Sequence, residues 1–312
     1  MLVSPKRSEL VLLFAGLLFI NGIGQSLKDT LDLSGLGNPA DSGLSRVAFR
    51  MVHDLEYSLS CSALHFLNWK QGSDVNLVSI LHHLKYQVQC TNDRYVKFSN
   101  TFIHELGLRY LADSISQFHP DENTLNTRLE LRIRKTISFF FYSSMTTPLL
   151  DSYLYNVDSA GRLLKKLCAS FMTPFIATFS TGFGLNTPRV GTLSLGLSAA
   201  RFTWIRNRKV FGRQNAPDIY GVTEEKGFAF EYGISLHLLV DRDLLKRIHW
   251  NCDLLIFKNY RKPADVALKN LVGIRLSKLL KMNIQTRLFY EQEVSRNIQV
   301  ETLLILGLYV NL

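Results

Sequence analysis

The chain has 312 residues, of which 46% are hydrophobic and 20% charged, with 36 Lys+Arg against 26 Asp+Glu and a formal net charge of +10. This composition supplies enough apolar material for a folded core, and it excludes a disordered chain, a collagen-like repeat and a small disulfide-rich domain. After the N-terminal segment there is no run of about eighteen apolar residues, so a multi-helix membrane protein is also excluded.

The N-terminus has the layout of a secretory signal peptide. Lys6 and Arg7 give a basic start, Leu10–Ile20 is an apolar run, and Asn21–Gly24 is a small, turn-prone stretch at which cleavage is expected. A buried N-terminal helix is the alternative for this segment. Residues 25–50 are polar and rich in glycine, which predicts a flexible periplasmic leader. The predicted organisation is therefore a signal peptide at 1–24, a leader at 25–50 and a folded domain at 51–312.

From about residue 55 the hydrophobic pattern has a period of two. In the stretch 298–310 the even-numbered residues are aliphatic except Thr302, whereas the odd-numbered ones include Gln299, Glu301 and Gly307. The stretch 228–240 alternates in the same way. Successive strand side chains point to opposite faces, so each such segment predicts a strand with one apolar and one polar face. Twelve segments are predicted, at 55–66, 75–89, 95–110, 124–134, 137–150, 172–185, 190–206, 228–240, 244–258, 264–277, 280–292 and 297–311.

Strand length and loop length indicate which kind of β-protein this is. Several segments exceed ten residues, as strands do when they cross a bilayer at a tilt. Long connections are expected after odd-numbered segments, at 111–123, 151–171 and 207–227. Tight turns are expected after even-numbered segments, at 90–94, 135–136, 186–189, 241–243 and 278–279.

Short turns at one rim and longer loops at the other are typical of outer-membrane barrels. The sequence therefore predicts an all-β fold, a transmembrane antiparallel up-and-down β-barrel of about 12 strands, within a range of about 10 to 14, in the outer membrane. A soluble secreted β-sandwich or lipocalin-like binding protein is the alternative. A period of two does not by itself show whether the polar face of each strand lines the interior or forms the outer surface.

The two faces of the predicted strands assign a lumen side and a lipid side. The predicted lumen-lining charged residues are Lys97, Glu105, Arg109, Arg128, Glu130, Arg132, Arg134, Glu231, Asp253, Lys269, Arg275, Lys281, Arg287, Glu291 and Glu301. The predicted lipid-facing residues are Leu236, Leu238, Trp250, Leu254, Leu304, Leu306 and Leu308.

The predicted lumen has mixed charge, with nine basic and six acidic residues in that set. Cross-strand ion pairs can neutralise such an interior and plug a narrow barrel. Alternatively, a water-filled passage rich in Arg and Lys favours anions. Both interpretations stay open, and together they predict a non-enzymatic channel, transport or envelope-structural protein of unknown cargo, with a small anionic solute as a candidate partner.

No catalytic or cofactor-binding motif stands out in the sequence. The GxSxG, HExxH, phosphate-loop and GxGxxG motifs are absent, and the neighbours His82 and His83 point to opposite faces of a strand, so they cannot share a metal. A phospholipase-like outer-membrane hydrolase is the enzymatic alternative, with His104 and either Ser99 or Ser143, although the spacing selects neither serine. We expect no enzyme activity, no cofactor and no metal.

The cysteines and the basic loops carry the remaining signals. Cys61, Cys90, Cys168 and Cys252 are scattered, and we expect free thiols on strands rather than two disulfides. The stretch Gly161–Ala169 predicts either a short interfacial helix or a loop packed on the rim. The basic loop residues that suggest contact with lipopolysaccharide phosphates are Arg206, Arg208, Lys209, Arg213, Arg261 and Lys262.

The predicted partners are membrane lipid and lipopolysaccharide, together with the outer-membrane assembly machinery. Nucleic acid is not expected as a partner, because the positive charge is spread over alternating strands of a chain that carries an export signal.

Four stretches resemble a known family in order and spacing: Asn68–Gly72, Lys135–Thr147 with its Phe139–Tyr142 aromatic run, Phe171–Phe175, and the closing run from Phe257–Tyr260 to Gly307–Tyr309. The family comprises uncharacterised outer-membrane barrels, found mainly in Bacteroidetes-type bacteria and catalogued as a domain of unknown function. The resemblance covers residues 55–312 and implies a fold and a location but no activity.

The sequence departs from this family at a few positions. Pro148 follows Thr147 where the family has glutamine, and Ser73 replaces a second glycine. The last residue, Leu312, stands where many outer-membrane barrels have an aromatic residue that the assembly machinery reads, so Tyr309 is the candidate for that signal.

Overall fold

The computed structural model describes residues 49–67, 77–92, 95–110, 116–157, 163–187, 191–213, 218–277, 279–290 and 297–311. The predicted signal peptide and nearly all of the predicted leader lie outside these ranges, and both remain predictions. Among the described residues no helix has the length and apolar character needed to cross a membrane.

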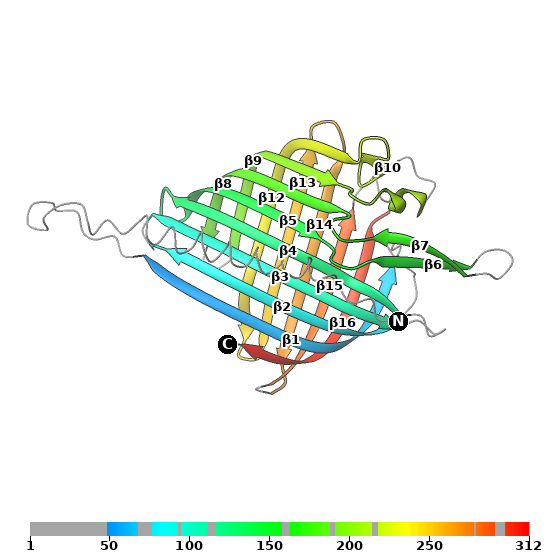
Figure 1. Ribbon diagram of the computed structural model, residues 1–312. Coiled ribbons are helices and arrows are strands. Elements are labelled where there is room, and N and C mark those ends of the chain that lie inside the picture. The colour runs from blue at the N-terminus through cyan, green and yellow to red at the C-terminus, as the bar shows by residue number, and fades with distance from the viewer. Residues whose placement is uncertain are drawn as a thin grey trace, which may run out of the picture. The chain divides into compact units, whose positions relative to one another are not determined.

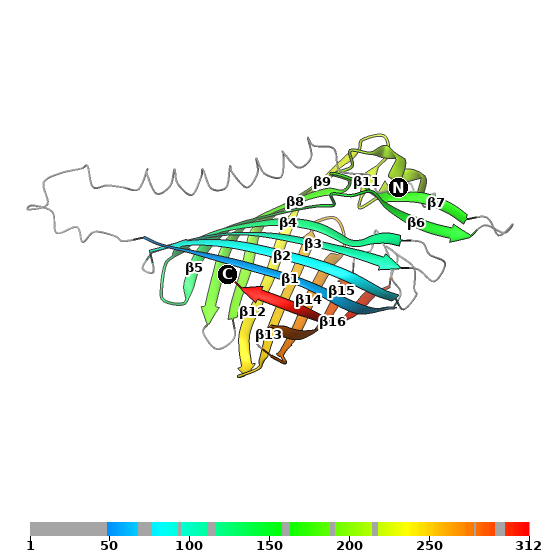
Figure 2. The same ribbon diagram turned by 60° about the horizontal axis from the view of Figure 1, so that its bottom comes forward.

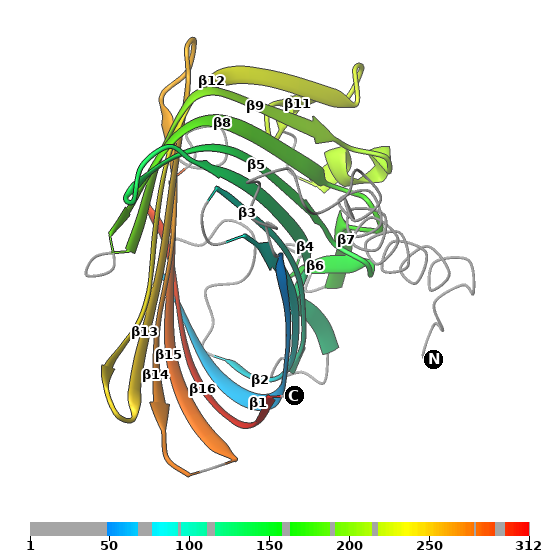
Figure 3. The same cartoon turned by 90° about the vertical axis from the view of Figure 1, so that its left-hand side faces the viewer.

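Twelve long strands form the main sheet. They are β1 (Arg50–Leu67), β2 (Leu77–Thr91), β3 (Val96–Tyr110), β4 (Ser116–Arg132), β5 (Ile137–Thr147), β8 (Phe175–Thr187), β9 (Gly191–Trp204), β12 (Phe228–Leu245), β13 (Ile248–Asn259), β14 (Ala264–Arg275), β15 (Leu280–Tyr290) and β16 (Gln299–Asn311). Each pairs antiparallel with its neighbour, and β1 pairs with β16 from Glu56 opposite Asn311 to Leu67 opposite Val300. The sheet is therefore a closed barrel (Figures 1 and 3), and the predicted fold class is confirmed.

The predicted strands all exist, but three boundaries differ from the prediction by about five residues or more. β4 begins at Ser116, so the connection before it is shorter than the predicted loop at 111–123. β12 continues through the predicted turn at 241–243, because Asp241 and Asp243 pair in register with Asn251 and His249. β1 begins at Arg50, inside the predicted leader. These extensions are rich in polar residues, so the hydrophobic alternation that identified the strands did not reach them.

Smaller elements occur in the connections between consecutive barrel strands. They lie at the rim that carries the longer connections, which we call the long-loop rim (Figures 1 and 2). β6 (Ser152–Val157) and β7 (Leu163–Ala169) form a hairpin, β10 (Asp218–Ile219) and β11 (Val222–Thr223) form a second one, and η2 (Arg208–Arg213) is a 3-10 helix. The interfacial helix considered for Gly161–Ala169 is wrong, because its described part is the strand β7.

A buried apolar cluster packs these rim elements together. It contains Ile205, Val210, Phe211 and Val222, and Leu167 of β7 packs against it. Val222 is fully buried and Val210 is 2% exposed. This packing connects the β6–β7 hairpin to the segment between β9 and β12.

The outer wall of the barrel is apolar. Large side chains such as Phe183 and Leu195 are each nearly half exposed, and they alternate along their strands with buried small or polar residues. Contact with water would make such a wall unfavourable by about 25 cal/mol per Å² of apolar surface, whereas hydrocarbon accommodates it. Closure of the sheet also pairs the backbone groups that a bilayer cannot solvate. The chain is an outer-membrane β-barrel, and a lipocalin-like barrel would carry these side chains inside.

The four cysteines lie on strands as predicted. Cys61 is on β1, Cys90 on β2, Cys168 on β7 and Cys252 on β13, and all four are free thiols. Cys61 is exposed and pairs in register with Leu306 and Ile80, both of which are exposed on the outer wall.

Candidate functional site in the barrel interior

A group of three charged residues joins opposite walls of the barrel. Lys269 Nζ on β14 donates to Glu105 Oε1 on β3 at 2.9 Å, and Arg287 Nη2 on β15 donates to Glu105 Oε2. Around the ring, β3 is separated from β14 by β2, β1, β16 and β15. Figure 3 shows these two walls facing each other. The contact therefore crosses the interior, and we call Glu105, Lys269 and Arg287 the central bridge.

The central bridge is supported by two further groups. Arg287 Nη1 lies 3.5 Å from Glu301 Oε2, directly opposite it in register, and His83 Nδ1 lies 3.3 Å from Glu105 Oε1. Glu105 is 4% exposed and Glu301 is fully buried. Buried charges are tolerated when they are paired and hydrogen-bonded, so these residues depend on one another.

A second network lies toward the short-turn rim, which is the end of the barrel that carries the turn between β4 and β5. Arg128 on β4 forms an ion pair with Glu130 and donates to Ser194 Oγ on β9 at 2.8 Å. Asn186 on β8 donates to the other oxygen of Glu130 at 3.2 Å. The guanidinium of Arg128 lies over the ring of Phe140, 4.8 Å from its centroid. Strands β4, β5, β8 and β9 are thus tied together on the inner face.

A third network lies toward the long-loop rim. Arg201 Nη1 on β9 is 2.7 Å from Asp265 Oδ2 on β14 and 3.6 Å from Glu231 Oε2 on β12. Lys262, in the loop between β13 and β14, donates to Glu231 Oε1 at 3.0 Å. Asn259 donates to the same oxygen at 3.0 Å.

Between the networks, the inner face contains closely packed polar contacts. Ser180 on β8 and Ser235 on β12 are hydrogen-bonded at 2.7 Å, across the intervening strand β9. This bond passes over Gly196, where a Cβ atom would lie 2.0 Å from the Ser180 hydroxyl and 2.2 Å from the Ser235 hydroxyl. Glycine is therefore required at this position because a larger side chain has no room, and not because of the backbone conformation.

Parts of the interior are open to water. His237 Nε2 on β12 is 2.8 Å from Asp253 Oδ1 on β13, yet the Asp253 side chain is 44% exposed. The Lys269 side chain is 37% exposed, although its partner Glu105 is buried. The central bridge therefore has water access on the Lys269 side.

The inner face also carries an apolar cluster. Leu81, Leu303 and Ile305 are buried together, and Phe289 packs against them. The sequence analysis assigned Leu303 and Ile305 to neither face, and the structure places them on the same alternation as Glu301. Their neighbours Leu304 and Leu306 are exposed on the outer wall.

The structure places the predicted lumen residues in three groups. Lys97 pairs in register with Glu130, and Lys281 with Arg275. Arg132 and Arg275 end their strands and are exposed, and Arg134 lies in the turn between β4 and β5, so Arg134 belongs to the short-turn rim rather than to the wall. The side chain of Arg109 and all of Glu291 lie outside the described residues. The remaining eight, Glu105, Arg128, Glu130, Glu231, Asp253, Lys269, Arg287 and Glu301, take part in the contacts above.

The predicted lipid-facing residues share rows with the exposed apolar side chains. Leu304, Leu306 and Leu308 are 47%, 48% and 59% exposed. Leu236 and Leu238 pair in register with the exposed Leu195 and Leu193, and Leu254 pairs with Leu238. Trp250 Nε1 donates to Asn270 Oδ1 at 2.7 Å on the same side of the sheet. Contact of these side chains with lipid remains a prediction.

The sequence analysis missed several charged residues of the interior. Arg201 was overlooked because an irregularity of register between β9 and β12 interrupts the alternation near Gly196. Asp265 could have been found, since it lies four residues before Lys269 and therefore on the same face. Lys262 and His83 carry no pattern that marks them as partners of Glu231 and Glu105.

The residues considered for a hydrolase do not come together. His104 Nδ1 is 2.7 Å from Asn123 Oδ1, its partner in register on β4. Ser99 is an odd number of residues from His104 on β3, so it points to the other face of the sheet. Ser143 pairs with Thr127, four residues along β4 from Asn123. Neither serine is placed to be activated by His104.

The sequence matches one described protein family over part of its length. Residues 61–153 match the family model described as "Protein of unknown function (DUF3078)". The predicted resemblance to an uncharacterised family is thereby confirmed over this range, whereas the bacterial group stays a prediction. The Asn68–Gly72 stretch of that resemblance lies outside the described residues. No curated protein matches the chain.

Several solved structures are similar to this chain at low sequence identity. The translocator domain of the autotransporter NalP from Neisseria meningitidis is 8% identical, with a TM-score of 0.42 and coverage of 95% of this chain and 96% of that one. The toluene transporter TodX from Pseudomonas putida is 8% identical, with a TM-score of 0.35 and coverage of 90% and 92%. The KdgM porin is 9% identical, with a TM-score of 0.30 and coverage of 82% and 98%.

Proposed function

We propose that the protein is a non-enzymatic channel of the outer membrane, with a narrow passage for small anionic solutes that is constricted at the central bridge. The observation that carries this proposal is the ion pair that joins β3 to β14 across the interior, next to a side of Lys269 that is open to water. Charged side chains at a constriction control which ions pass.

The preference for anions is supported at the short-turn rim. The inner networks pair acid with base, so they are close to neutral. At the rim, by contrast, the exposed basic residues outnumber the exposed acidic residues Asp241 and Asp243; they include Arg134, Lys135, Lys246, Arg247 and Arg275. A rim rich in one sign of charge raises the local concentration of the opposite ion, which favours the entry of anions.

Planar-bilayer recording tests this function. The wild-type protein should give small, discrete, anion-selective conductance steps. Glu105→Gln removes the carboxylate that both Lys269 and Arg287 contact, so repulsion between these two cations should open the constriction and increase both the conductance and the anion selectivity. Glu224→Gln, in an exposed loop, removes the same charge and should leave both unchanged. Cation selectivity in the wild-type protein would contradict the proposal.

A permanently plugged, envelope-structural barrel is the second candidate. The buried cluster of Leu81, Leu303, Ile305 and Phe289 favours it, because apolar side chains that fill an interior leave no wet path at that level. Silence of both the wild-type protein and Glu105→Gln in bilayers would support this candidate over the channel.

The absence of catalysis is tested separately. Protein refolded in detergent should not hydrolyse ester or phospholipid substrates, because neither Ser99 nor Ser143 lies beside His104. Hydrolysis that is lost on Ser143→Ala would contradict the non-enzymatic function.

A further inference from the structure

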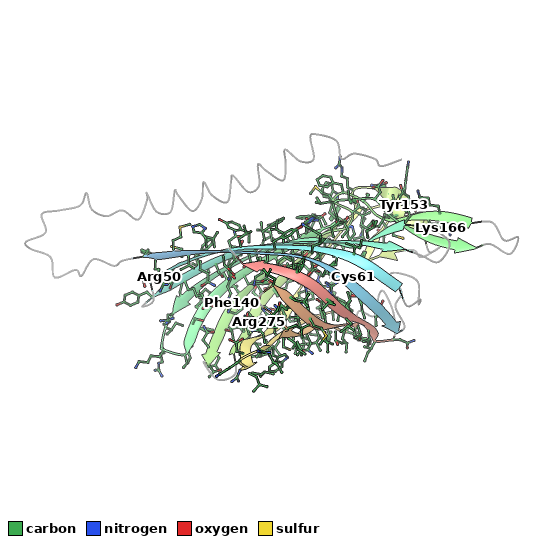
Figure 4. The ribbon with its side chains drawn as sticks, turned by 90° about the horizontal axis from the view of Figure 1, so that it is seen from below. Arg50, Cys61, Phe140, Tyr153, Lys166 and Arg275 are labelled. Carbon is green, nitrogen blue, oxygen red and sulfur yellow. The ribbon has the colours of Figure 1, made fainter. Side chains whose placement is uncertain are left out.

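A cavity of about 440 Å³ lies at the long-loop rim, outside the barrel interior. It is lined by residues of the β6–β7 hairpin and of the segment around η2, including Tyr153, Lys165, Lys166, Asn207 and Lys209. Figure 4 shows Tyr153 and Lys166 together on this hairpin, at the end of the barrel away from Arg50. The proposed channel does not use this cavity.

The walls of the cavity are held in place by packing. Leu167, which also lines it, packs against the buried cluster that contains Val210 and Phe211 of η2. The backbone N–H of Asn207 donates to the Thr173 hydroxyl at 3.0 Å. The hairpin and the η2 segment are therefore fixed relative to each other, and the cavity is preformed.

The cavity carries an excess of positive charge. Lys165, Lys166 and Lys209 line it against one acidic residue, Asp151. Asp151 accepts a hydrogen bond from the Tyr153 hydroxyl at 3.3 Å, and the ammonium of Lys165 lies 3.8 Å from the centroid of the Tyr153 ring. The aromatic ring thus holds one ammonium group at the cavity without neutralising it.

An amide donor completes the polar lining. The Oδ1 atom of Asn207 accepts from the backbone N–H of Lys209 at 3.2 Å, which fixes the orientation of the amide and places its NH₂ group on the other side. The two ammonium groups of Lys165 and Lys209, with one amide donor, match the acceptor oxygens and the double charge of a phosphate group better than the single charge of a carboxylate.

The neighbouring basic residues are engaged elsewhere. Arg206 lies over the ring of Phe171, Arg208 donates to the carbonyl of Glu225, and Lys262 is paired with Glu231 in the interior. Of the loop residues expected to meet lipopolysaccharide, Lys209 is the one that lines the cavity. The side chain of Arg213 lies outside the described residues.

We infer that this cavity is a binding site for a phosphate group, presented either on a lipid headgroup of the outer leaflet or as a small phosphorylated solute. The long-loop rim is the side that faces the exterior in outer-membrane barrels. It therefore lies next to the phosphorylated lipid headgroups of the outer leaflet. Phosphate binding here is independent of conduction, so the failure of one proposal leaves the other standing.

The test is a binding measurement on the full-length protein. We would titrate protein refolded in detergent with inorganic phosphate, and protein in vesicles with lipid A that carries or lacks its phosphates. The double variant Lys165→Gln/Lys209→Gln should bind phosphate-bearing probes about tenfold more weakly, which corresponds to about 1.4 kcal/mol. Lys226→Gln/Lys246→Gln removes the same charge from exposed positions outside the cavity and should bind like the wild type. Lys209→Arg should also retain binding.

Each outcome decides the inference. Saturable binding of phosphorylated lipid A alone supports the site with a lipid headgroup as its source, and binding of inorganic phosphate as well supports a small phosphorylated solute. The inference is overturned if neither probe binds, if lipid A without phosphates binds equally well, or if the two double variants lose affinity equally. Heat-modifiable gel migration of each variant verifies that it is folded.

Discussion

At the scale of single residues, the interior depends on matched charge. Arg287 is 8% exposed and interacts with two carboxylates, Glu105 and Glu301, of which Glu301 is fully buried. A buried pair of this kind adds little net stability over an apolar equivalent, but removal of one partner leaves the others uncompensated. The arrangement therefore specifies how the walls meet rather than how stable the barrel is.

Arg287→Met tests this dependence. The change leaves Glu105 and Glu301 without their shared counter-charge, so we expect the free energy of unfolding in lipid vesicles, measured by urea titration, to fall by about 3–5 kcal/mol. The triple variant Arg287→Met/Glu105→Gln/Glu301→Gln removes the whole charge set and should recover most of the loss. A triple variant as unstable as the single one would show that packing, not charge, holds this region together.

Gly196 offers a second test at this scale. Gly196→Ala places a methyl group within 2.2 Å of both the Ser180 and Ser235 hydroxyls, so it must break their hydrogen bond. We expect a loss of about 1–3 kcal/mol of stability in the same urea titration. Combining it with Ser180→Ala and Ser235→Ala clears the space and should restore stability. If the triple change is no better than Gly196→Ala, the glycine is required for another reason.

At the scale of elements, the sequence predicted all twelve barrel strands, because an alternating pattern survives wherever one side of a strand meets lipid. It failed where the alternation is polar on both sides, as in β12 beyond Val240. At Leu303–Leu306 on β16, where both sides of the strand are apolar, the pattern found the strand but did not identify Leu303 and Ile305 as inner residues. For the candidate site, the sequence supplied Glu105, Lys269 and Arg287 as inward charges. The bridge joins Glu105 to Lys269, which follows it by 164 positions, and to Arg287, which follows it by 182 positions. No local sequence pattern encodes contacts between residues so far apart in the chain.

The two sides of β16 can be compared directly. Leu304→Arg puts a charge among exposed apolar side chains on the outer wall and should cost about 2–4 kcal/mol if it lies near the bilayer midplane. Glu301→Gln on the same strand changes an inner residue without adding charge, and Arg287 keeps Glu105 as its counter-charge, so this variant should still assemble. The yield of heat-modifiable barrel after assembly into vesicles is the measurement. Normal assembly of Leu304→Arg would show that the outer wall does not face lipid.

At the scale of the whole molecule, the barrel has a short-turn rim and a long-loop rim, and the β6–β7 hairpin and η2 lie at the second. The orientation in the membrane follows from this asymmetry, because longer loops face the exterior in outer-membrane barrels. The exposed Glu224 lies at the long-loop rim and the exposed Arg247 in the turn between β12 and β13. These two positions therefore mark the two ends of the barrel.

Labelling of intact cells tests this orientation. A membrane-impermeant maleimide should label Glu224→Cys in intact cells, whereas Arg247→Cys should react only after the outer membrane is permeabilised. Wild-type protein, which contains four free thiols, gives the background. Labelling of Arg247→Cys in intact cells would reverse the orientation and place the phosphate cavity on the periplasmic side.

Cell fractionation followed by gel electrophoresis with and without heating tests most directly whether the apolar wall is embedded in hydrocarbon. We predict that the native protein separates with the outer membranes, requires detergent for extraction, and migrates faster before heating than after it. Recovery of a dissolved, monomeric protein from detergent-free buffer would contradict a membrane-embedded barrel and the channel proposed from it.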